Sequence, residues 1–194
     1  PKRDWSSDVC SSDLKGETDI SDASRPITKA EVEACKSTGL EFIELPIAYD
    51  GLTIVVNRRN DWAKELSVEQ LKRIFGATGT AKTWKDLNPA WPDRAIKVYS
   101  PGTDSGTFDY FKEVTVGKDG KIRADMSVSE DDNVLVNGVA GDQDAIGFFG
   151  FAYFQENGEK LHAVAIDGGK GAVMPNDRTI LDGSYTPYSR PLFI

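Results

Sequence analysis

The feature that most constrains this chain is the stretch IKVYSPGTDSGTFDYF, residues 96–111. A short apolar run, Ile96 to Tyr99, stops at Ser-Pro-Gly and is followed by Asp104-Ser105-Gly106-Thr107 and a helix-compatible segment ending near Val114. This order predicts a strand, a tight turn and a helix start. The first amides of a helix have no partner inside it, and the positive end of the helix dipole points the same way. With two hydroxyl donors and a glycine that permits close approach, the pattern indicates an anion site.

The rest of the sequence alternates predicted strands and helices, which favours an α/β fold over a β-sandwich or a helix bundle. Thr28 with Glu31, and Ser67 with Gln70, form capping boxes that mark two helix starts. The predicted helices are Lys29–Ser37, SVEQLKRIF up to Gly76, Ser127–Gly138, Asp177–Leu181 and, as a helix or an aromatic turn, Gly150–Asn157. The predicted strands are Glu41–Pro46, Leu52–Val56, Ala145–Phe149 and Leu161–Ile166, with an irregular connection over Gly76–Pro92.

Composition limits the classes of partner. The chain has 31 acidic and 23 basic residues in 194, a net charge of −8, and no run of lysine and arginine. This balance argues against nucleic acid and anionic membranes as partners. No apolar run approaches the ~20 residues of a membrane span.

The acidic motifs do not predict a metal site. The run Glu130-Asp131-Asp132 fits a solvated helix start, and Asp119-Gly120 lacks the spaced carboxylates of a calcium loop.

The N-terminal segment Asp4–Leu14 reads DWSSDVCSSDL, which resembles the one-frame translation of a common short-read sequencing adapter. A natural linker rich in serine and aspartate is the alternative. We exclude residues 1–14 from the fold prediction as a non-native segment. One of the two cysteines, Cys10, lies in this segment. Cys35 lies on a predicted helix, where we expect a small buried hydrophobic residue rather than a reactive thiol.

A second informative stretch is DISDASRPI, residues 19–27, directly before a predicted helix. Alone, Ser24-Arg25-Pro26 could be a turn whose arginine faces water. Together with D-S-G-T it resembles the PstS family of phosphate-binding proteins of bacterial ABC transporters, in its SphX-like branch. The resemblance runs from about Lys15 to the end of the sequence. It is also carried by FIELPIAYDGLTIVVN (42–57), TWKDLNPAWPDRAIKVY (83–99), DAIGFFGFAYF (144–154) and SYTPYSRPLFI (184–194).

The resemblance implies a type II periplasmic-binding-protein fold, in which two α/β lobes hold a ligand in the cleft between them. Residues 15–54 plus 152–194 would form lobe I and residues 55–151 lobe II. The family's first strand and the following Gly/Ser/Thr loop have no counterpart here. Family members also continue beyond Arg190–Ile194. The resemblance therefore implies that the sequence is a fragment with an incomplete lobe I.

The resemblance also implies a function. Proteins of this family are not enzymes and need no cofactor; they capture inorganic phosphate outside the cytoplasm and deliver it to the membrane subunits of an ABC importer. We expect the same of this chain, as a monomer in the periplasm or on the outer face of the cell envelope, with lipid anchoring of the parent protein left open. Binding of another oxyanion is the alternative within this class.

The expected phosphate-binding residues fall into two groups. Ser105, Gly106 and Thr107 would donate hydrogen bonds from one side, and Ser24 and Arg25 from the other, with Arg25 able to grip two oxygens. More distant family members have an aspartate where Ser24 stands, and that aspartate accepts the proton of hydrogen phosphate. Asp104 is the nearest replacement, although Asp104 or Ser105 could instead simply cap the helix. Asp50 and Asn133 are weaker candidates, because both residue types are common in turns and caps.

An enzyme is the alternative from another class. Ser105 could be a nucleophile, but a Ser-His-Asp arrangement would have to use His162, the only histidine, and Thr103 breaks the G-x-S-x-G pattern. A P-loop is disfavoured because Gly102–Thr107 lacks its lysine. A structural or adhesive surface protein is a third possibility, and it predicts no stabilisation by a ligand.

Overall fold

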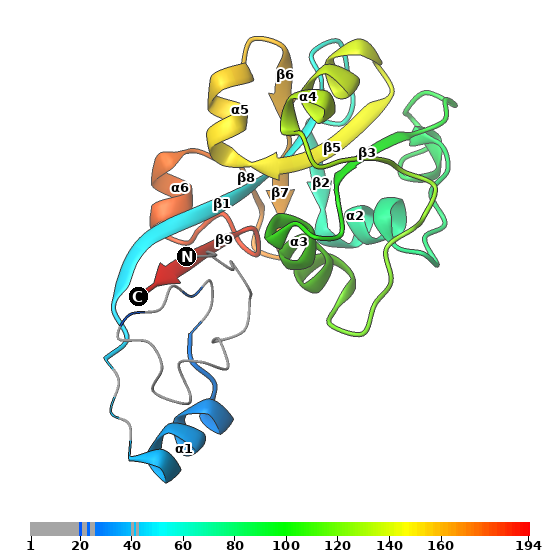
Figure 1. Ribbon diagram of the computed structural model, residues 1–194. Coiled ribbons are helices and arrows are strands. Elements are labelled where there is room, and N and C mark those ends of the chain that lie inside the picture. The colour runs from blue at the N-terminus through cyan, green and yellow to red at the C-terminus, as the bar shows by residue number, and fades with distance from the viewer. Residues whose placement is uncertain (1–19, 21–22, 24–25, 40, 42) are drawn as a thin grey trace. The chain divides into compact units, whose positions relative to one another are not determined.

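The computed structural model describes Ile20, Ala23, residues 26–39, Glu41 and residues 43–194 (Figure 1). Contacts divide the chain into two compact units, which we call unit 1 (Pro1–Asp50 and Arg190–Ile194) and unit 2 (Gly51–Ser189). The prediction of mixed α and β structure is confirmed. Apart from Cys35, every buried hydrophobic residue found in the described ranges lies between Leu52 and Tyr188, so the core belongs to unit 2.

In unit 1, helix α1 spans Lys29–Thr38. The predicted capping box is present, since Thr28 and Glu31 bond each other's backbone amides. The helix ends at Gly39, whose φ of 74° favours glycine. Cys35 is buried, as expected from the sequence. Strand β9, Ser189–Phe193, pairs with β1, Pro46–Asn57, and Leu45 and Ile194 exchange two backbone hydrogen bonds at 2.9 and 3.0 Å.

Strand β1 is longer than the sequence predicts. Two strands, Glu41–Pro46 and Leu52–Val56, were expected, but one continuous strand runs from Pro46 to Asn57, and the segment from Glu41 to Leu45 is not a strand where it is described. The strand continues through Asp50 and Gly51 because it pairs with β9, β5 and β6. From Leu52 to Asn57 every residue is buried, which explains the unbroken apolar run.

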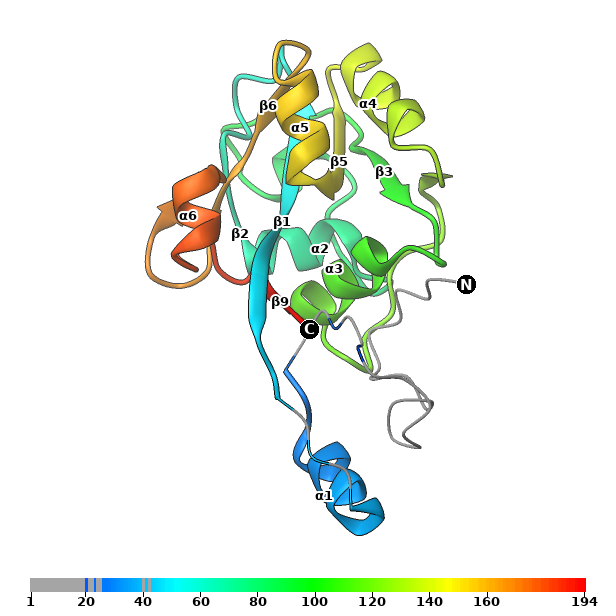
Figure 2. The same cartoon turned by 60° about the vertical axis from the view of Figure 1, so that its left-hand side comes forward.

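The main sheet has the order β4-β3-β5-β1-β6 (Figures 1 and 2). Its inner strands β3 and β5 are parallel, β4 extends the parallel set at one edge, and β1 runs antiparallel to both β5 and β6. A smaller sheet has the order β2-β7-β8. The strands are β2 (Glu65–Ser67), β3 (Lys97–Pro101), β4 (Ser127–Ser129), β5 (Ala145–Gly150), β6 (Leu161–Ala163), β7 (Ala165–Asp167) and β8 (Ala172–Val173).

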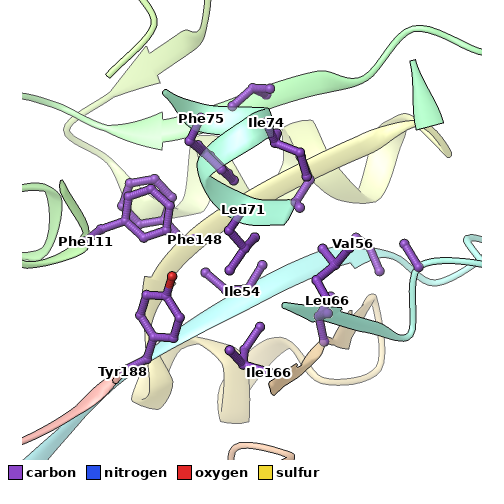
Figure 3. Close-up of a cluster of buried hydrophobic side chains, with 14 of the residues drawn as sticks. Ile54, Val56, Leu66, Leu71, Ile74, Phe75, Phe111, Phe148, Ile166 and Tyr188 are labelled. Atoms are coloured by element: carbon purple, nitrogen blue, oxygen red, sulfur yellow. The ribbon is translucent and has the colours of Figure 1, made fainter. Parts of the chain in front are cut away.

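Helices cover both faces of the main sheet. They are α2 (Val68–Phe75), α3 (Gly106–Val116), α4 (Asp132–Gly141), α5 (Phe151–Asn157) and α6 (Asp177–Leu181), with the short 3-10 helix η2 at Trp84–Asp86. Alternate residues of a strand point to opposite faces. Accordingly Ile54 and Phe148 pack in the core with α2 and α3, shown in Figure 3, whereas Val55 and Phe149 pack in a second core with α4.

Two further sequence predictions need correction. The helix expected over Ser127–Gly138 begins only at Asp132, because Ser127–Ser129 pairs with β3 as strand β4 and Asp131 caps the helix. The single strand expected over Leu161–Ile166 is split, since β6 pairs with β1 in the main sheet whereas β7 pairs with β2 in the smaller one. The helices capped by Ser67 and Asn176 lie where they were predicted.

Candidate anion-binding site

The predicted strand, turn and helix start are present in unit 2. Strand β3 ends at Pro101, a turn follows, and Ser105 is the N-cap of α3. The Ser105 hydroxyl oxygen accepts a hydrogen bond from the Thr107 amide at 3.2 Å, and the Ser105 amide donates to the Gly102 carbonyl at 3.1 Å. A hydroxyl that accepts from an amide keeps its own proton free to donate. The cap therefore leaves Ser105 able to donate to an anion.

The start of α3 is open toward solvent. Gly106 and Asp104 are exposed, while Ser105 and Thr107 are half-buried. A Cβ atom added at Gly106 would meet no other atom within 4 Å. The first-turn amides lie before the first helical hydrogen bond, which runs from the Asp109 amide to the Ser105 carbonyl at 3.1 Å. This helix start thus offers amide and hydroxyl donors to a small ligand.

The core of unit 2 holds α3 in place. Phe111 is fully buried, and its ring stacks on Phe148 with a centroid distance of 3.8 Å. Figure 3 shows these two rings beside Phe75 and Tyr188. At the C-terminal end of the helix, the buried hydroxyls of Thr115 and Tyr188 are hydrogen-bonded at 2.8 Å. Burial raises the pKa of Tyr188, which therefore stays a neutral phenol. These buried contacts of α3 hold the start of the helix in a fixed position.

A second helix begins at the same sheet edge. Strands β3 and β4 are parallel, with Pro101 opposite Ser129. Both strands therefore end at the carboxyl edge of the sheet, which is where open α/β sheets bind ligands. Helix α4 follows β4 and is capped by Asp131, whose carboxylate accepts from the amide of Asn133 at 2.9 Å and from its side chain at 3.1 Å. The carboxyl edge of β3 and β4 therefore presents two helix starts.

This edge also carries acids. Glu130 and Asp131 lie between β4 and α4, and Asp132 is the first residue of α4. The pKa of Asp132 is raised, first by burial and then by the neighbouring charges of Asp131 and Glu130. An anion bound at the start of α3 would therefore meet nearby negative charge as well as donors. The sequence suggested only a solvated helix start for these acids, because the alignment of β3 with β4 cannot be read from a single sequence.

The structure brings some of the predicted site residues together. Asp104, Ser105, Gly106 and Thr107 lie in one turn, and the helix cap among them is Ser105 rather than Asp104. Asn133 lies in the first turn of α4. Asp50, in unit 1, forms an ion pair with Arg190 at 3.2 Å. Ser24 and Arg25 lie outside the described residues, so their predicted roles stay predictions.

The residues of the alternative hydrolase are not close to each other. His162 lies on β6 opposite Val56, and β6 is separated from β3 by β5 and β1. Three strand spacings of about 4.8 Å place His162 roughly 14 Å from β3, the strand that leads to Ser105. This distance is far beyond a hydrogen bond, so a pair of Ser105 and His162 is disfavoured. In the described ranges, no group of histidine, cysteine and acidic side chains could hold a metal ion, and no helix is long and apolar enough to span a membrane.

Comparison with known proteins identifies relatives over most of the chain. Protein SphX of Synechocystis is 49% identical, covering 93% of this chain and 54% of that protein, and the phosphate-binding protein PstS of Staphylococcus haemolyticus is 44% identical, covering 93% and 56%. The chain therefore spans about half the length of the curated relatives it matches. The resemblance to the PstS family and its SphX-like branch is confirmed.

The similar solved structures are also of phosphate-binding proteins. The crystal structure of a possible phosphate-binding protein from Planctomyces limnophilus matches with a TM-score of 0.85 and 43% identity, covering 94% of this chain and 65% of that one. A putative phosphate ABC transporter substrate-binding protein from Clostridium perfringens, solved with bound phosphate, matches with a TM-score of 0.66 and 31% identity, covering 94% and 67%.

The family model described as a PBP superfamily domain matches residues 6–194. Together with the solved structures, this match confirms the predicted periplasmic-binding-protein fold. This chain belongs to the PBP superfamily.

Proposed function

We propose that this chain binds inorganic phosphate as part of the solute receptor of an ABC importer. The observation that carries the proposal is the start of α3, where the cap residue Ser105, the exposed Gly106 and Thr107 lie together at the carboxyl edge of parallel strands. Relatives named SphX and PstS, and a related protein solved with bound phosphate, support it. A desolvated tetrahedral anion needs several fixed donors, and this turn supplies them.

The proposed binding site has two sides. Ser105, Gly106 and Thr107 donate from α3, while Ser24 and Arg25 donate from the other side, with the Arg25 guanidinium contacting two phosphate oxygens. The two lobes implied by the resemblance are proposed to close around the ligand. Closure is driven by contacts that the ligand makes only in the closed state.

The proposal extends to the whole protein. The receptor works outside the cytoplasm as a monomer, without a cofactor and without catalysing a reaction, and passes phosphate to the membrane subunits of the importer. The names of the relatives support phosphate transport. The acidic net charge of −8 does not oppose it, because local donors set the field at a site.

Thermal unfolding with and without phosphate tests this function, with sulfate at matched ionic strength as the control ligand. At a phosphate concentration of 100 times the dissociation constant, the native state gains about 2.7 kcal/mol. We expect this stabilisation to disappear in Ser105→Ala and Arg25→Ala. The exposed Ser37 and Arg178 offer matched controls, Ser37→Ala and Arg178→Ala, which should respond like the wild type. If phosphate does not raise the unfolding temperature of a wild-type protein that unfolds cooperatively, the proposal is wrong.

A further inference from the structure

Tyr188 lies where the chain leaves unit 2 for the last time. It directly precedes strand β9, whose first residue, Ser189, is the last residue of unit 2. The Tyr188 carbonyl accepts a hydrogen bond from the Leu52 amide at 2.9 Å, and Leu52 follows Gly51, the residue with which β1 enters unit 2. Tyr188 therefore joins β1 and the start of β9 at the boundary that both strands cross.

The side chain of Tyr188 is attached to helix α3. Its hydroxyl is hydrogen-bonded to the Thr115 hydroxyl at 2.8 Å, and its ring stacks on Phe111 with a centroid distance of 6.0 Å. All three side chains are buried. In the residue before Tyr188, the Pro187 carbonyl accepts a hydrogen bond from the Tyr110 hydroxyl at 2.5 Å. The segment that leads into β9 is thus attached to α3 by two hydrogen bonds and a ring contact.

Helix α3 connects this attachment to the proposed anion site. The helix is continuous over 11 residues, and Ser105 precedes Thr115 by about 15 Å along the helix axis. An anion that accepts hydrogen bonds from the start of α3 restrains the whole helix, because a short continuous helix moves as one body. A movement of Tyr188 must therefore break its bond to Thr115 or displace the helix together with the anion.

The strand pair beyond Tyr188 is weakly buried. Residues Pro46–Tyr49 of β1 are exposed, and β9 is half-buried throughout. The Asp50–Arg190 ion pair, at 3.2 Å, lies next to the boundary. Poorly buried segments open locally without unfolding of the core. Local opening of the pair formed by β1 and β9 is therefore a motion that the position of Tyr188 can influence.

We propose that Tyr188 is a positioning residue that couples the proposed anion site to the pairing of β1 with β9. The anion restrains α3, α3 restrains Tyr188 through the Thr115 hydroxyl, and Tyr188 restrains the two strands through its backbone. The inference rests on the proposed function and adds a coupling to its site. Such coupling is reciprocal, so an opened strand pair binds the anion more weakly than a closed one.

Hydrogen exchange of the whole chain, followed by NMR with and without saturating phosphate, tests the proposal. In the wild type we expect phosphate to slow exchange of the Ile47–Tyr49 and Leu192–Phe193 amides at least about fivefold. Tyr188→Phe removes the hydroxyl and keeps the ring, and Thr115→Val removes the same hydrogen bond from the side of α3. In each variant we expect phosphate to slow these amides less than about twofold.

Affinity is measured in parallel by calorimetric titration with phosphate. Because the opened strand pair is a minor population, both variants should keep the wild-type affinity within about threefold. A purely structural role of the hydrogen bond predicts a different result, in which stability falls but phosphate slows these amides as in the wild type. The variant with both changes should match each single variant, since both changes remove one bond.

Tyr185→Phe is the matched control. Tyr185 is also fully buried, and no hydrogen bond from its hydroxyl to α3 is found in the described ranges. This variant should retain the wild-type effect of phosphate on exchange. Sulfate at matched ionic strength is the control ligand, and thermal unfolding verifies that each variant is folded before the exchange measurement.

The outcomes separate this proposal from the proposed function. If the wild type binds phosphate and Tyr188→Phe retains the slowing of exchange, the anion acts on these strands by another route, so the role of Tyr188 is wrong and the phosphate site stands. If phosphate binds without slowing these amides in the wild type, the coupling is equally wrong. If the folded wild type does not bind phosphate, the proposed function fails and the coupling fails with it.

Discussion

At the scale of single residues, Ser105 has two functions that a substitution can separate. Its hydroxyl oxygen caps α3 by accepting the Thr107 amide, and its proton is proposed to bind phosphate. An aspartate at this position caps a helix about as well as serine and suits the helix dipole. Loss of capping and loss of ligand binding are therefore distinct measurable effects at one position.

We predict that Ser105→Asp leaves the free energy of unfolding within about 0.5 kcal/mol of the wild type and weakens phosphate binding. The new negative charge near a bound anion costs about 1 to 4 kcal/mol, depending on solvent screening, which corresponds to a loss of about fivefold to a thousandfold in affinity. Urea denaturation and phosphate titration measure the two quantities. The same change at another helix cap, Ser67→Asp, is the control and should leave affinity unchanged. An unaltered affinity in Ser105→Asp would exclude the start of α3 as the site.

At the scale of elements, the position of α3 depends on one aromatic contact. Phe111 is fully buried and packs against Phe75 and Phe148, with ring centroids 4.7 and 3.8 Å away. We predict that Phe111→Ala lowers the free energy of unfolding of unit 2 by about 3–5 kcal/mol, because a large cavity forms in the core. Urea denaturation followed by tryptophan fluorescence reports mainly on unit 2, which contains three of the four tryptophans, Trp62, Trp84 and Trp91. Tyr153→Ala, at a side chain that is 41% exposed, is the control and should cost far less.

The sequence predicts individual elements better than it predicts their pairing. Helices with strong local signals, such as the capping boxes at Thr28 and Ser67, lie where the sequence places them. The wrong boundaries are at β1 and β4, where pairing with a distant strand overrides the local pattern. The same limitation affects the site. The turn at Ser105 is local and was predicted, whereas the contact of Glu130 with Gly102 depends on the alignment of β3 with β4 and was not.

At the scale of the whole molecule, strand β1 belongs to both units and its two halves differ. From Pro46 to Tyr49 the strand is exposed, and from Gly51 to Asn57 it is buried in the sheet of unit 2. Amides that open only by global unfolding exchange most slowly, while those in poorly buried segments exchange through local opening. We therefore predict that the amides of Ile54–Val56 exchange at least about a hundredfold more slowly than those of Ile47–Tyr49. Hydrogen exchange followed by mass spectrometry or NMR measures this, and uniform protection along β1 would contradict the division at Asp50.

The division into units also bears on the order in which the protein can fold during synthesis. Unit 2 is a single continuous segment, Gly51–Ser189, whereas unit 1 combines residues before Gly51 with Arg190–Ile194. Domains generally fold as units while the chain emerges from the ribosome. Unit 2 therefore has its full sequence available before strand β9 is complete, and the pairing of Leu45 with Ile194 can form only after the residues of unit 2 have been translated. The start of α3 lies in the unit whose sequence is complete first.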